Sequence, residues 1–277
     1  WSDWTELLTN SAILAFLPLQ VPQIIKNFGN ISSGASDAIS ILPWMGYSTG
    51  ILANILLLSY FVSQKEKGAA RVQAVGVATS AVVVAQIFYA GFMPGFAFWT
   101  IVPAIAAGLL LNYVSFKGNL NAGVWRGWNV ATGLAGFVVL PLVFWATFSP
   151  FVFAGAGMLP GFLLAGAAGL LGAFMMWGEG AGRLPPKVLS FWRNINAWTA
   201  TALFIFGPLA QLANNLTNPA QIAGIALATL LLGTAGNLVM LPRAVLTKDR
   251  IWFTGSFWAV AVGGWVVLLT MFLYGAL

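Results

Sequence analysis

The sequence predicts an all-α integral membrane protein of about nine transmembrane helices, with two parallel three-helix repeats joined by a central three-helix block. Three observations predict this fold. The chain is 60% hydrophobic and 6% charged, whereas a soluble domain is about a quarter charged. The apolar residues form continuous runs, which is typical of helices rather than of the alternating strands of a β-barrel. Finally, a pattern of polar residues near the N-terminus recurs near the C-terminus.

Polar or Gly/Pro breaks divide the apolar runs into nine expected spans. Most are about 20 residues or longer, which at 1.5 Å per residue crosses a ~30 Å hydrocarbon core. The chain begins with Trp1 rather than Met, so we expect it to be trimmed or processed. The segment before the first span carries Asp3 and Glu6 and is expected to lie at the membrane interface. The expected spans are 10–27, 38–63, 69–91, 95–116, 123–147, 157–178, 190–214, 221–242 and 251–275.

The basic residues test the number of spans. With nine spans, every Lys and Arg except Lys26 falls on one face of the membrane. The positive-inside rule therefore supports nine helices, with the N-terminus on the positive, stromal or cytosolic, side. The net charge of +6 then reflects membrane topology, and no nucleic-acid partner is expected. The residues on the positive face are Lys65, Lys67, Arg71, Lys117, Arg126, Arg183, Lys187, Arg193, Arg243, Lys248 and Arg250.

The composition excludes most chemistry. The chain has no His and no Cys, so it has no nucleophile–imidazole pair, no thiolate and no zinc site of the usual kind. We therefore expect no enzyme activity, metal or cofactor. Carboxylates are absent from mid-membrane depth, since Asp37 and Glu179 fall at helix ends. This argues against a proton- or sodium-driven pump, against a charged selectivity ring and against a charged substrate.

The recurring pattern consists of amide side chains at matching positions. A Gln and an Asn four residues apart end the first and the seventh expected span, and the following span carries Gly and Asn four residues apart. A basic loop and a third span then follow in both places. Each span of the second copy comes six spans after its counterpart in the first, and six is even, so both copies have the same orientation, as parallel repeats do. The matching pairs are Gln23/Asn27 with Gln211/Asn215, and Gly50/Asn54 with Gly233/Asn237.

These repeats divide the chain into three parts. Residues 1–94 form the first repeat with its interfacial segment, residues 95–187 the central helices, and residues 188–277 the second repeat. Pro22 and Pro208 lie at similar positions in the two repeats, where a proline removes a helical hydrogen bond. We interpret them as hinges for alternating access, although proline is frequent in membrane helices.

Neutral amides and aromatic rings are the candidate binding groups. Amides both donate and accept hydrogen bonds, which suits a neutral polyhydroxylated substrate, and a sugar ring can lie flat on an indole. The alternatives are that the amides join helices and that the indoles pack or face lipid. Trp1, Trp4, Trp125 and Trp252 are assigned to the interfacial belt. The candidate substrate-binding residues are Gln23, Asn54, Gln211, Asn237, Trp44, Trp145 and Trp198.

Longer strings carry a family resemblance. Pro22-Gln23 followed by a short polar loop resembles the PQ-loop motif of the superfamily that holds the SWEET sugar facilitators and lysosomal amino-acid exporters. Four strings resemble the maltose excess family, the plastid maltose exporters. They are LPLQVPQIIKN at 17–27, AWTATALF at 197–204, GNLVMLPRA at 236–244 and IWFTGSFWA at 251–259.

The resemblance implies a uniporter that exports maltose from the stroma across the chloroplast inner envelope after starch breakdown, with the lipid bilayer and the sugar as its partners. The chain departs from the superfamily's three-plus-one-plus-three layout, with three helices in the middle, and it has Ala210 where a full second motif has Pro. An exporter of glucose, an amino acid or another small neutral metabolite, with or without proton coupling, is the alternative. A non-transporting receptor on the same fold also stays open, as does the oligomeric state.

Overall fold

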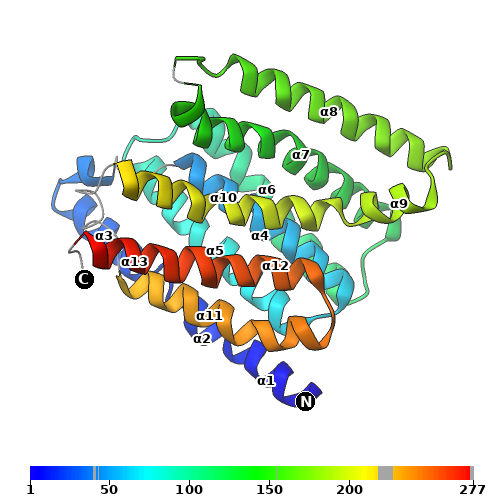
Figure 1. The fold of residues 1–277 in the computed structure, drawn as a ribbon, viewed down its shortest axis with the longest axis horizontal. Coiled ribbons are helices and arrows are strands. Elements are labelled where there is room, and N and C mark those ends of the chain that lie inside the picture. The colour runs from blue at the N-terminus through cyan, green and yellow to red at the C-terminus, as the bar shows by residue number, and fades with distance from the viewer. Residues whose placement is uncertain (40–41, 43, 154, 218–226, 275–277) are drawn as a thin grey trace.

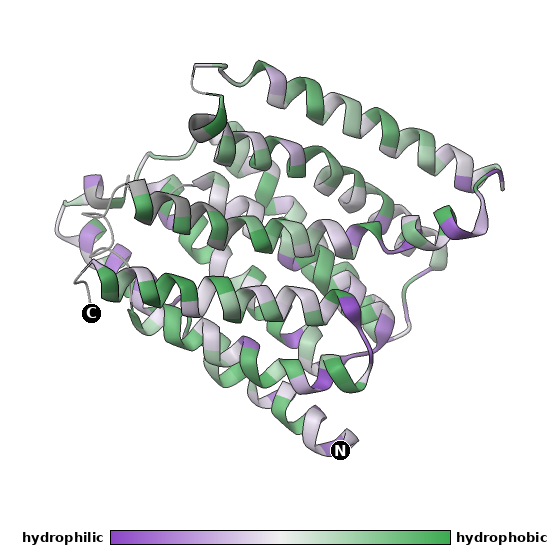
Figure 2. Ribbon diagram, in the orientation of Figure 1, coloured by the Kyte–Doolittle hydropathy of each residue, from purple (hydrophilic) through white to green (hydrophobic). Residues whose placement is uncertain are grey.

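The computed structural model describes the chain except residues 40–41, 43, 154, 218–226 and 275–277 (Figure 1). The described residues form helices that run side by side in a bundle, and no strand occurs among them. Figure 2 shows hydrophobic residues along most of each helix. The segments are α1 Ser2–Ser11, α2 Ile13–Phe16, α3 Val21–Ser32, η1 Ser36–Ile39, α4 Trp44–Gln64, α5 Lys67–Tyr89, α6 Gly95–Phe116, α7 Ala122–Val152, α8 Leu159–Gly180, α9 Pro186–Arg193, α10 Ile195–Thr217, α11 Leu227–Leu246, α12 Arg250–Trp258, the π-helix η3 Ala259–Val266 and α13 Val267–Leu273.

Membrane-spanning length is common to most of these helices. Within the described residues, 8 helical segments are long and apolar enough to cross a membrane, counting α1–α3 as one and α12–α13 as one. The apolar described part of α10, Ile195–Phe206, is shorter. The predicted all-α membrane class is confirmed for this part of the chain, and the count of nine spans stays a prediction.

The N-terminal segment is helical where the sequence predicted a stretch before the first helix. The first helix begins at Ser2 rather than near residue 10, and α1 packs against α5 and α11. Asp3 and Glu6 lie on its exposed face, whereas Thr5 and Thr9 are buried. The Thr9 hydroxyl donates to the carbonyl of residue 5 (3.0 Å), so the buried face leaves no free hydroxyl. The two carboxylates do not end the helix, because an amphipathic helix can keep them in water on its exposed face.

Helix packing places the two predicted repeats against each other. In the N-terminal part, α5 packs against α4 and against the α1–α3 run; in the C-terminal part, α12–α13 packs against both α10 and α11. Across the two parts, α4 packs against α10, and α1 packs against α11. Helix α7 contacts α4 and α10, and α8 covers α7 at the edge of the bundle (Figure 1). One hydrophobic core, which includes Leu56, Phe61 and Trp252, therefore joins the two parts.

Two turns of the bundle have the same backbone geometry. Lys65 between α4 and α5 has φ 59°, and Lys248 between α11 and α12 has φ 55°; they are the two non-glycine residues with positive φ in the described chain. In each turn the lysine amide donates to the carbonyl three residues earlier, and the next amide donates to the carbonyl five residues earlier. The chain spacing between these lysines equals that between Asn54 and Asn237. The register inferred from the two asparagines therefore extends through the turns.

The N-terminus and the α8–α9 and α11–α12 connections lie at one end of the bundle (Figure 1). We call this end, which also carries the α4–α5 and α6–α7 connections, the basic end. Every Lys and Arg except Lys26 belongs to these connections or to the helix turns beside them.

The positive φ of the two lysines leads to a stability prediction. A β-branched residue in the left-handed region is strained, so Lys248→Val should lower the free energy of unfolding by about 1–2 kcal/mol. Lys248→Gly removes the same charge without strain and serves as the control. Thermal unfolding of the purified protein in detergent checks this, and equal melting temperatures for the two variants would contradict the turn geometry.

Candidate functional site

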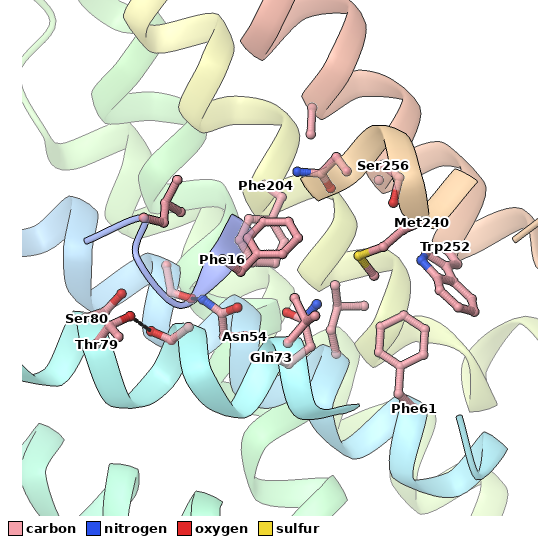
Figure 3. A pocket seen from close by; sticks show the side chains of 18 of the residues that line it. Phe16, Asn54, Phe61, Gln73, Thr79, Ser80, Phe204, Met240, Trp252 and Ser256 are labelled. Atoms are coloured by element: carbon pink, nitrogen blue, oxygen red, sulfur yellow. Dashed lines mark hydrogen bonds between the residues drawn. The ribbon is translucent and has the colours of Figure 1, made fainter. Parts of the chain in front are cut away.

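A cavity of about 490 Å³ lies between the N-terminal and C-terminal parts of the bundle. This volume falls in the range of ~300–1,000 Å³ that small-molecule sites occupy. None of the described residues that line it is Asp, Glu, Lys or Arg. Its polar lining consists of amides and hydroxyls, and its walls include the aromatic rings of Phe16, Tyr47, Phe61, Phe204 and Trp252 (Figure 3). The arrangement suits a neutral ligand that has both hydroxyls and apolar faces.

Two of the predicted amides meet in this cavity. Asn54 of α4 and Asn237 of α11 both line it. Each side chain donates from Nδ2 to the carbonyl of the glycine four residues earlier in its helix, at 2.8 Å for Asn54 and 2.9 Å for Asn237. This bond fixes the amide against its own helix and leaves the Oδ1 acceptor and one N–H for other partners.

Further lining residues occur as matched pairs. Leu57 and Met240 have the same chain spacing as the two asparagines, and so do Gln73 and Ser256; all four line the cavity. Phe16 and Phe204, which also line it, have instead the spacing that separates Gln23 from Gln211. The matched pairs are Asn54/Asn237, Leu57/Met240, Gln73/Ser256 and Phe16/Phe204. The cavity therefore lies where equivalent positions of the two parts face each other.

Gly76 of α5 allows α4 and α5 to approach each other closely beside Asn54. A Cβ atom on Gly76 would lie 2.6 Å from Asn54 Oδ1, which is too close for any side chain at that position without a shift of the amide. Gly76 itself lines the cavity. The absence of a side chain here lets the amide lie between the two helices.

Two buried polar atoms in the cavity wall have no hydrogen-bond partner among the described residues. They are Oε1 of Gln73, an acceptor, and Nε1 of Trp252, a donor. The residues are 8% and 3% exposed, so bulk water does not satisfy them. Such an unpaired group costs about 1–3 kcal/mol. A ligand hydroxyl, which both donates and accepts, would supply the missing partner of each.

Gln23 lies outside the cavity lining and belongs to a network between α3 and α5. Its Nε2 donates to Asn27 Oδ1 (2.7 Å), and Asn27 Nδ2 donates to Gln86 Oε1 (3.0 Å). The Gln86 amide in turn donates to the carbonyl of Ile24 (3.0 Å). Asn27 is 1% exposed. In this structure the amides of the first motif hold α3 on α5, which is the helix-joining role left open by the sequence.

The three predicted stacking residues also lie outside the cavity lining. Trp44 begins α4 and packs on the core that contains Val77 and Ile87. Trp145 donates from Nε1 to the carbonyl of Gly157 (2.8 Å), at the turn between α7 and α8. Trp198 is partly buried against the core shared by the two parts. Their role in binding stays a prediction.

Of the two predicted hinges, the side chain of Pro22 is described in the structure and that of Pro208 is not. Pro22 is an exposed residue in the first turn of α3, where its missing N–H interrupts no helical hydrogen bond. The break in the N-terminal run instead falls between α2 and α3, at Pro18. Pro208 and Gln211 fall within α10, but their side chains lie outside the described residues.

Comparison with known proteins identifies the family. The family model of the maltose excess protein 1 N-terminal domain matches residues 1–121. The rice (Oryza sativa subsp. japonica) "Maltose excess protein 1-like, chloroplastic" is 39% identical over 277 residues, covering 100% of this chain and 68% of the relative. This chain belongs to the maltose excess family. The Arabidopsis thaliana "Maltose excess protein 1, chloroplastic" is 38% identical over 273 residues, 99% of this chain and 64% of the relative. No solved structure matches.

The family resemblance predicted from the four strings is thus confirmed, but the sequence missed several lining residues of this maltose excess protein. Gln73 lies two turns into α5. Because it is close to the basic loop along the chain, its position offered no reason to place it in a binding site. Trp252 was assigned to the interfacial belt, yet it is 3% exposed and lines the cavity. The signal that finds Gln73 is the repeat itself, because the register of the two asparagines pairs it with Ser256.

The network between α3 and α5 predicts a structural role for Gln86. Gln86→Leu removes two hydrogen bonds and leaves the buried Nδ2 of Asn27 without an acceptor, so stability should fall by about 1–3 kcal/mol. Asn119, which is exposed, provides the control variant Asn119→Leu. Thermal unfolding in detergent measures the difference. Equal melting temperatures for both variants would show that these amides do not join the helices.

Proposed function

We propose that this maltose excess protein is a facilitative transporter that carries maltose across the chloroplast inner envelope through the cavity between its two three-helix units. The observation that carries this proposal is a cavity without charged side chains whose wall holds an unpaired acceptor and an unpaired donor, Gln73 Oε1 and Trp252 Nε1. The choice of maltose as the sugar and of the chloroplast as the compartment rests on the names of the two relatives.

The chemistry of the cavity favours passive transport of a neutral sugar. Ion-coupled transporters use carboxylates within the membrane to bind the coupling ion, and no carboxylate lines this cavity in the described chain. Aromatic rings offer faces for the C–H surface of a pyranose, and amides offer donors and acceptors for its hydroxyls. A uniporter needs nothing more, because the sugar gradient supplies the free energy.

Parallel three-helix units suit alternating access. Their existence is supported by the packing, in which the third helix of each unit, α5 or α12–α13, lies against both other helices of its unit. The contacts between units are reciprocal: the second helix of the first unit packs on the first helix of the second (α4 on α10), and the first packs on the second (α1 on α11). Reciprocal contacts are what a two-fold axis generates. With nine spans, the positive-inside rule puts the basic end in the stroma.

Two polar contacts join the units at the basic end. The Tyr60 hydroxyl of α4 donates to Asp249 Oδ2 at the start of α12 (2.9 Å). Arg243 of α11 pairs with Glu66 at the start of α5, with Nη2 3.1 Å from Oε1 and Nε 3.4 Å from Oε2. We call these two contacts the paired latches.

The latches are the same contact repeated by the symmetry of the units. The chain spacing that relates the two cavity asparagines also relates Tyr60 to Arg243 and Glu66 to Asp249. Between the latches and the cavity, the rings of Phe61 and Trp252 meet edge to face, with centroids 5.0 Å apart. We infer that the latches and these rings separate the cavity from the basic end. Alternating access then requires both latches to open together as the units separate there.

The transport proposal predicts the outcome of a counterflow experiment. Purified protein in liposomes should exchange labelled maltose, with or without a pH gradient. Asn54→Ala and Asn237→Ala should each weaken maltose affinity roughly 5–10-fold, through loss of about one hydrogen bond. Asn112→Ala is the matched control, since Asn112 makes the same bond to the carbonyl of Gly108 (2.7 Å) but does not line the cavity.

Other results of that experiment would overturn specific parts of the proposal. A requirement for the pH gradient would replace the uniporter by a proton-coupled carrier. Exchange of glucose or an amino acid but not maltose would replace the substrate. Absence of any exchange would leave a non-transporting protein. Wild-type affinity in both cavity variants would make Asn54 and Asn237 structural residues.

The paired latches predict a conformational lock. The chain has no Cys, so Glu66→Cys with Arg243→Cys can be joined by a reducible bifunctional thiol reagent. Cross-linking should abolish maltose exchange, and reduction should restore it, because the basic end must open in each transport cycle. Glu179→Cys with Arg193→Cys is the control, since that ion pair (3.5 Å) joins α8 to α9 and not the two units. Unimpaired exchange after cross-linking of Glu66→Cys with Arg243→Cys would contradict the gate.

A further inference from the structure

The polar groups of the cavity lie at two depths. Asn237 lies in the middle of α11, whereas Trp252 lies in the first turn of α12, just after the turn that joins these helices. At 1.5 Å per residue, Trp252 is roughly 10 Å nearer the basic end than Asn237. In Figure 3, Asn54 and Trp252 lie on opposite sides of Gln73 and Met240. We call Asn54 and Asn237 the inner level. Gln73 lies one helical turn (~4.5 Å) from Gly76, which lies against Asn54, and Trp252 lies farther toward the basic end. We call Gln73 and Trp252 together the basic-end level.

The two levels differ in how far their hydrogen bonds are satisfied. At the inner level, each amide already donates to a carbonyl of its own helix. At the basic-end level, Gln73 Oε1 and Trp252 Nε1 are buried and have no partner among the described residues. Both unpaired atoms of the cavity wall therefore belong to residues on the basic-end side of the asparagines, first Gln73 and then Trp252.

The donor at the basic-end level is held in place before any ligand arrives. The indole of Trp252 meets the ring of Phe61 at an interplanar angle of 68°. Its backbone N–H donates to Asp249 Oδ1 (3.0 Å), which caps the start of α12. Such preorganisation lowers the entropy cost of binding, so the N–H can contribute to affinity.

We propose that Gln73 and Trp252 form a subsite for the second ring of a disaccharide, and that this subsite makes the protein prefer maltose to a monosaccharide. The inference rests on the proposed function. A hydroxyl of the second ring would donate to Gln73 Oε1, and a hydroxyl would accept from the Trp252 indole. The distance from the inner level to Trp252 exceeds the width of one pyranose ring and suits two linked rings. A monosaccharide at the inner level can reach Gln73 but does not reach Trp252.

The subsite also breaks the symmetry of the cavity. The inner level is symmetric, with an asparagine from each unit. At the basic-end level, the counterpart of Gln73 is Ser256, and the counterpart of Trp252 is Ala69, a buried residue outside the cavity lining. A disaccharide has two different ends and no two-fold axis. An asymmetric subsite therefore selects one orientation of the sugar, which two identical halves could not do.

The test compares a disaccharide with a monosaccharide in the same variants. Trp252→Phe keeps an aromatic ring but removes the N–H donor, and Gln73→Leu or Gln73→Met removes the acceptor at similar size. Unlabelled maltose and glucose compete with labelled maltose in counterflow. Each variant should weaken maltose about 5–10-fold, and Trp252→Phe should leave competition by glucose unchanged. Trp99→Phe, a change of the same kind at an exposed residue outside the cavity lining, should alter neither.

The outcomes separate this inference from the proposed function. If the wild type exchanges maltose but Trp252→Phe weakens maltose and glucose equally, or weakens neither, the subsite is overturned while the transporter stands. A wild type that carries and binds no maltose overturns both. The Gln73→Leu and Gln73→Met variants check each other, since a folding defect confined to one would not appear in both melting curves.

Discussion

In a bilayer, a polar group can find hydrogen bonds only within the protein, and this constraint organises the interior of the bundle. Serine and threonine hydroxyls return to the carbonyl four residues earlier, as Thr9, Ser48 and Ser63 do. The amides of Asn54, Asn112 and Asn237 do the same. A few buried side-chain atoms of the described chain still have no partner, and Asn10, Asn112 and Thr201 carry three of them outside the cavity lining. The other two, Gln73 Oε1 and Trp252 Nε1, belong to residues of the cavity wall. These two are the ones that the proposed sugar would satisfy, without any charge.

The sequence predicted the helical class, which follows from composition. The two units stay a prediction from residues that recur at fixed spacing, and several of these residues meet in the cavity. Asn54 and Asn237, which the sequence predicted to bind substrate, both line the cavity. Their role in binding stays a prediction. The boundaries were less predictable. Hydropathy gives weight to Asp3 and Glu6, but the packing of Thr5 and Thr9 decides that α1 belongs to the bundle. Propensity and charge are local properties, whereas the partner of a helix face is a property of the whole fold.

The same difference between local sequence and whole fold explains why the sequence chose tryptophans that lie outside the cavity lining. Trp44, Trp145 and Trp198 lie deep by position in their spans, but depth does not say which side of a helix faces the cavity. Trp252 lies near a helix end, where a belt residue is the ordinary expectation. It turns inward because the Asp249 cap begins α12 there and because Phe61 of the other unit packs on its ring. Gln73 was missed for a related reason, since its distance from the basic loop along the chain says nothing about its neighbours across the bundle.

Charge at the basic end serves two purposes that are physically compatible. The basic residues that the positive-inside rule uses to predict the orientation include Arg243, and this residue also pairs with Glu66 across the bundle. The pair is only partly exposed, with side-chain exposures of 14% and 18%, and exposed pairs contribute at most about 1 kcal/mol while hydrogen bonds to charged groups contribute about 1.5–3 kcal/mol. Under the proposed mechanism, two such contacts would hold the end closed by a few kcal/mol, which thermal motion overcomes on the microsecond-to-millisecond scale of domain movements. A stronger latch would trap a carrier of the proposed kind, because it would have no ion gradient to open it. Asp249 both accepts from Tyr60 and caps the helix that carries Trp252. In the proposal, a sugar bound to that indole would therefore share a carboxylate with the latch, which would couple binding to opening through a single side chain.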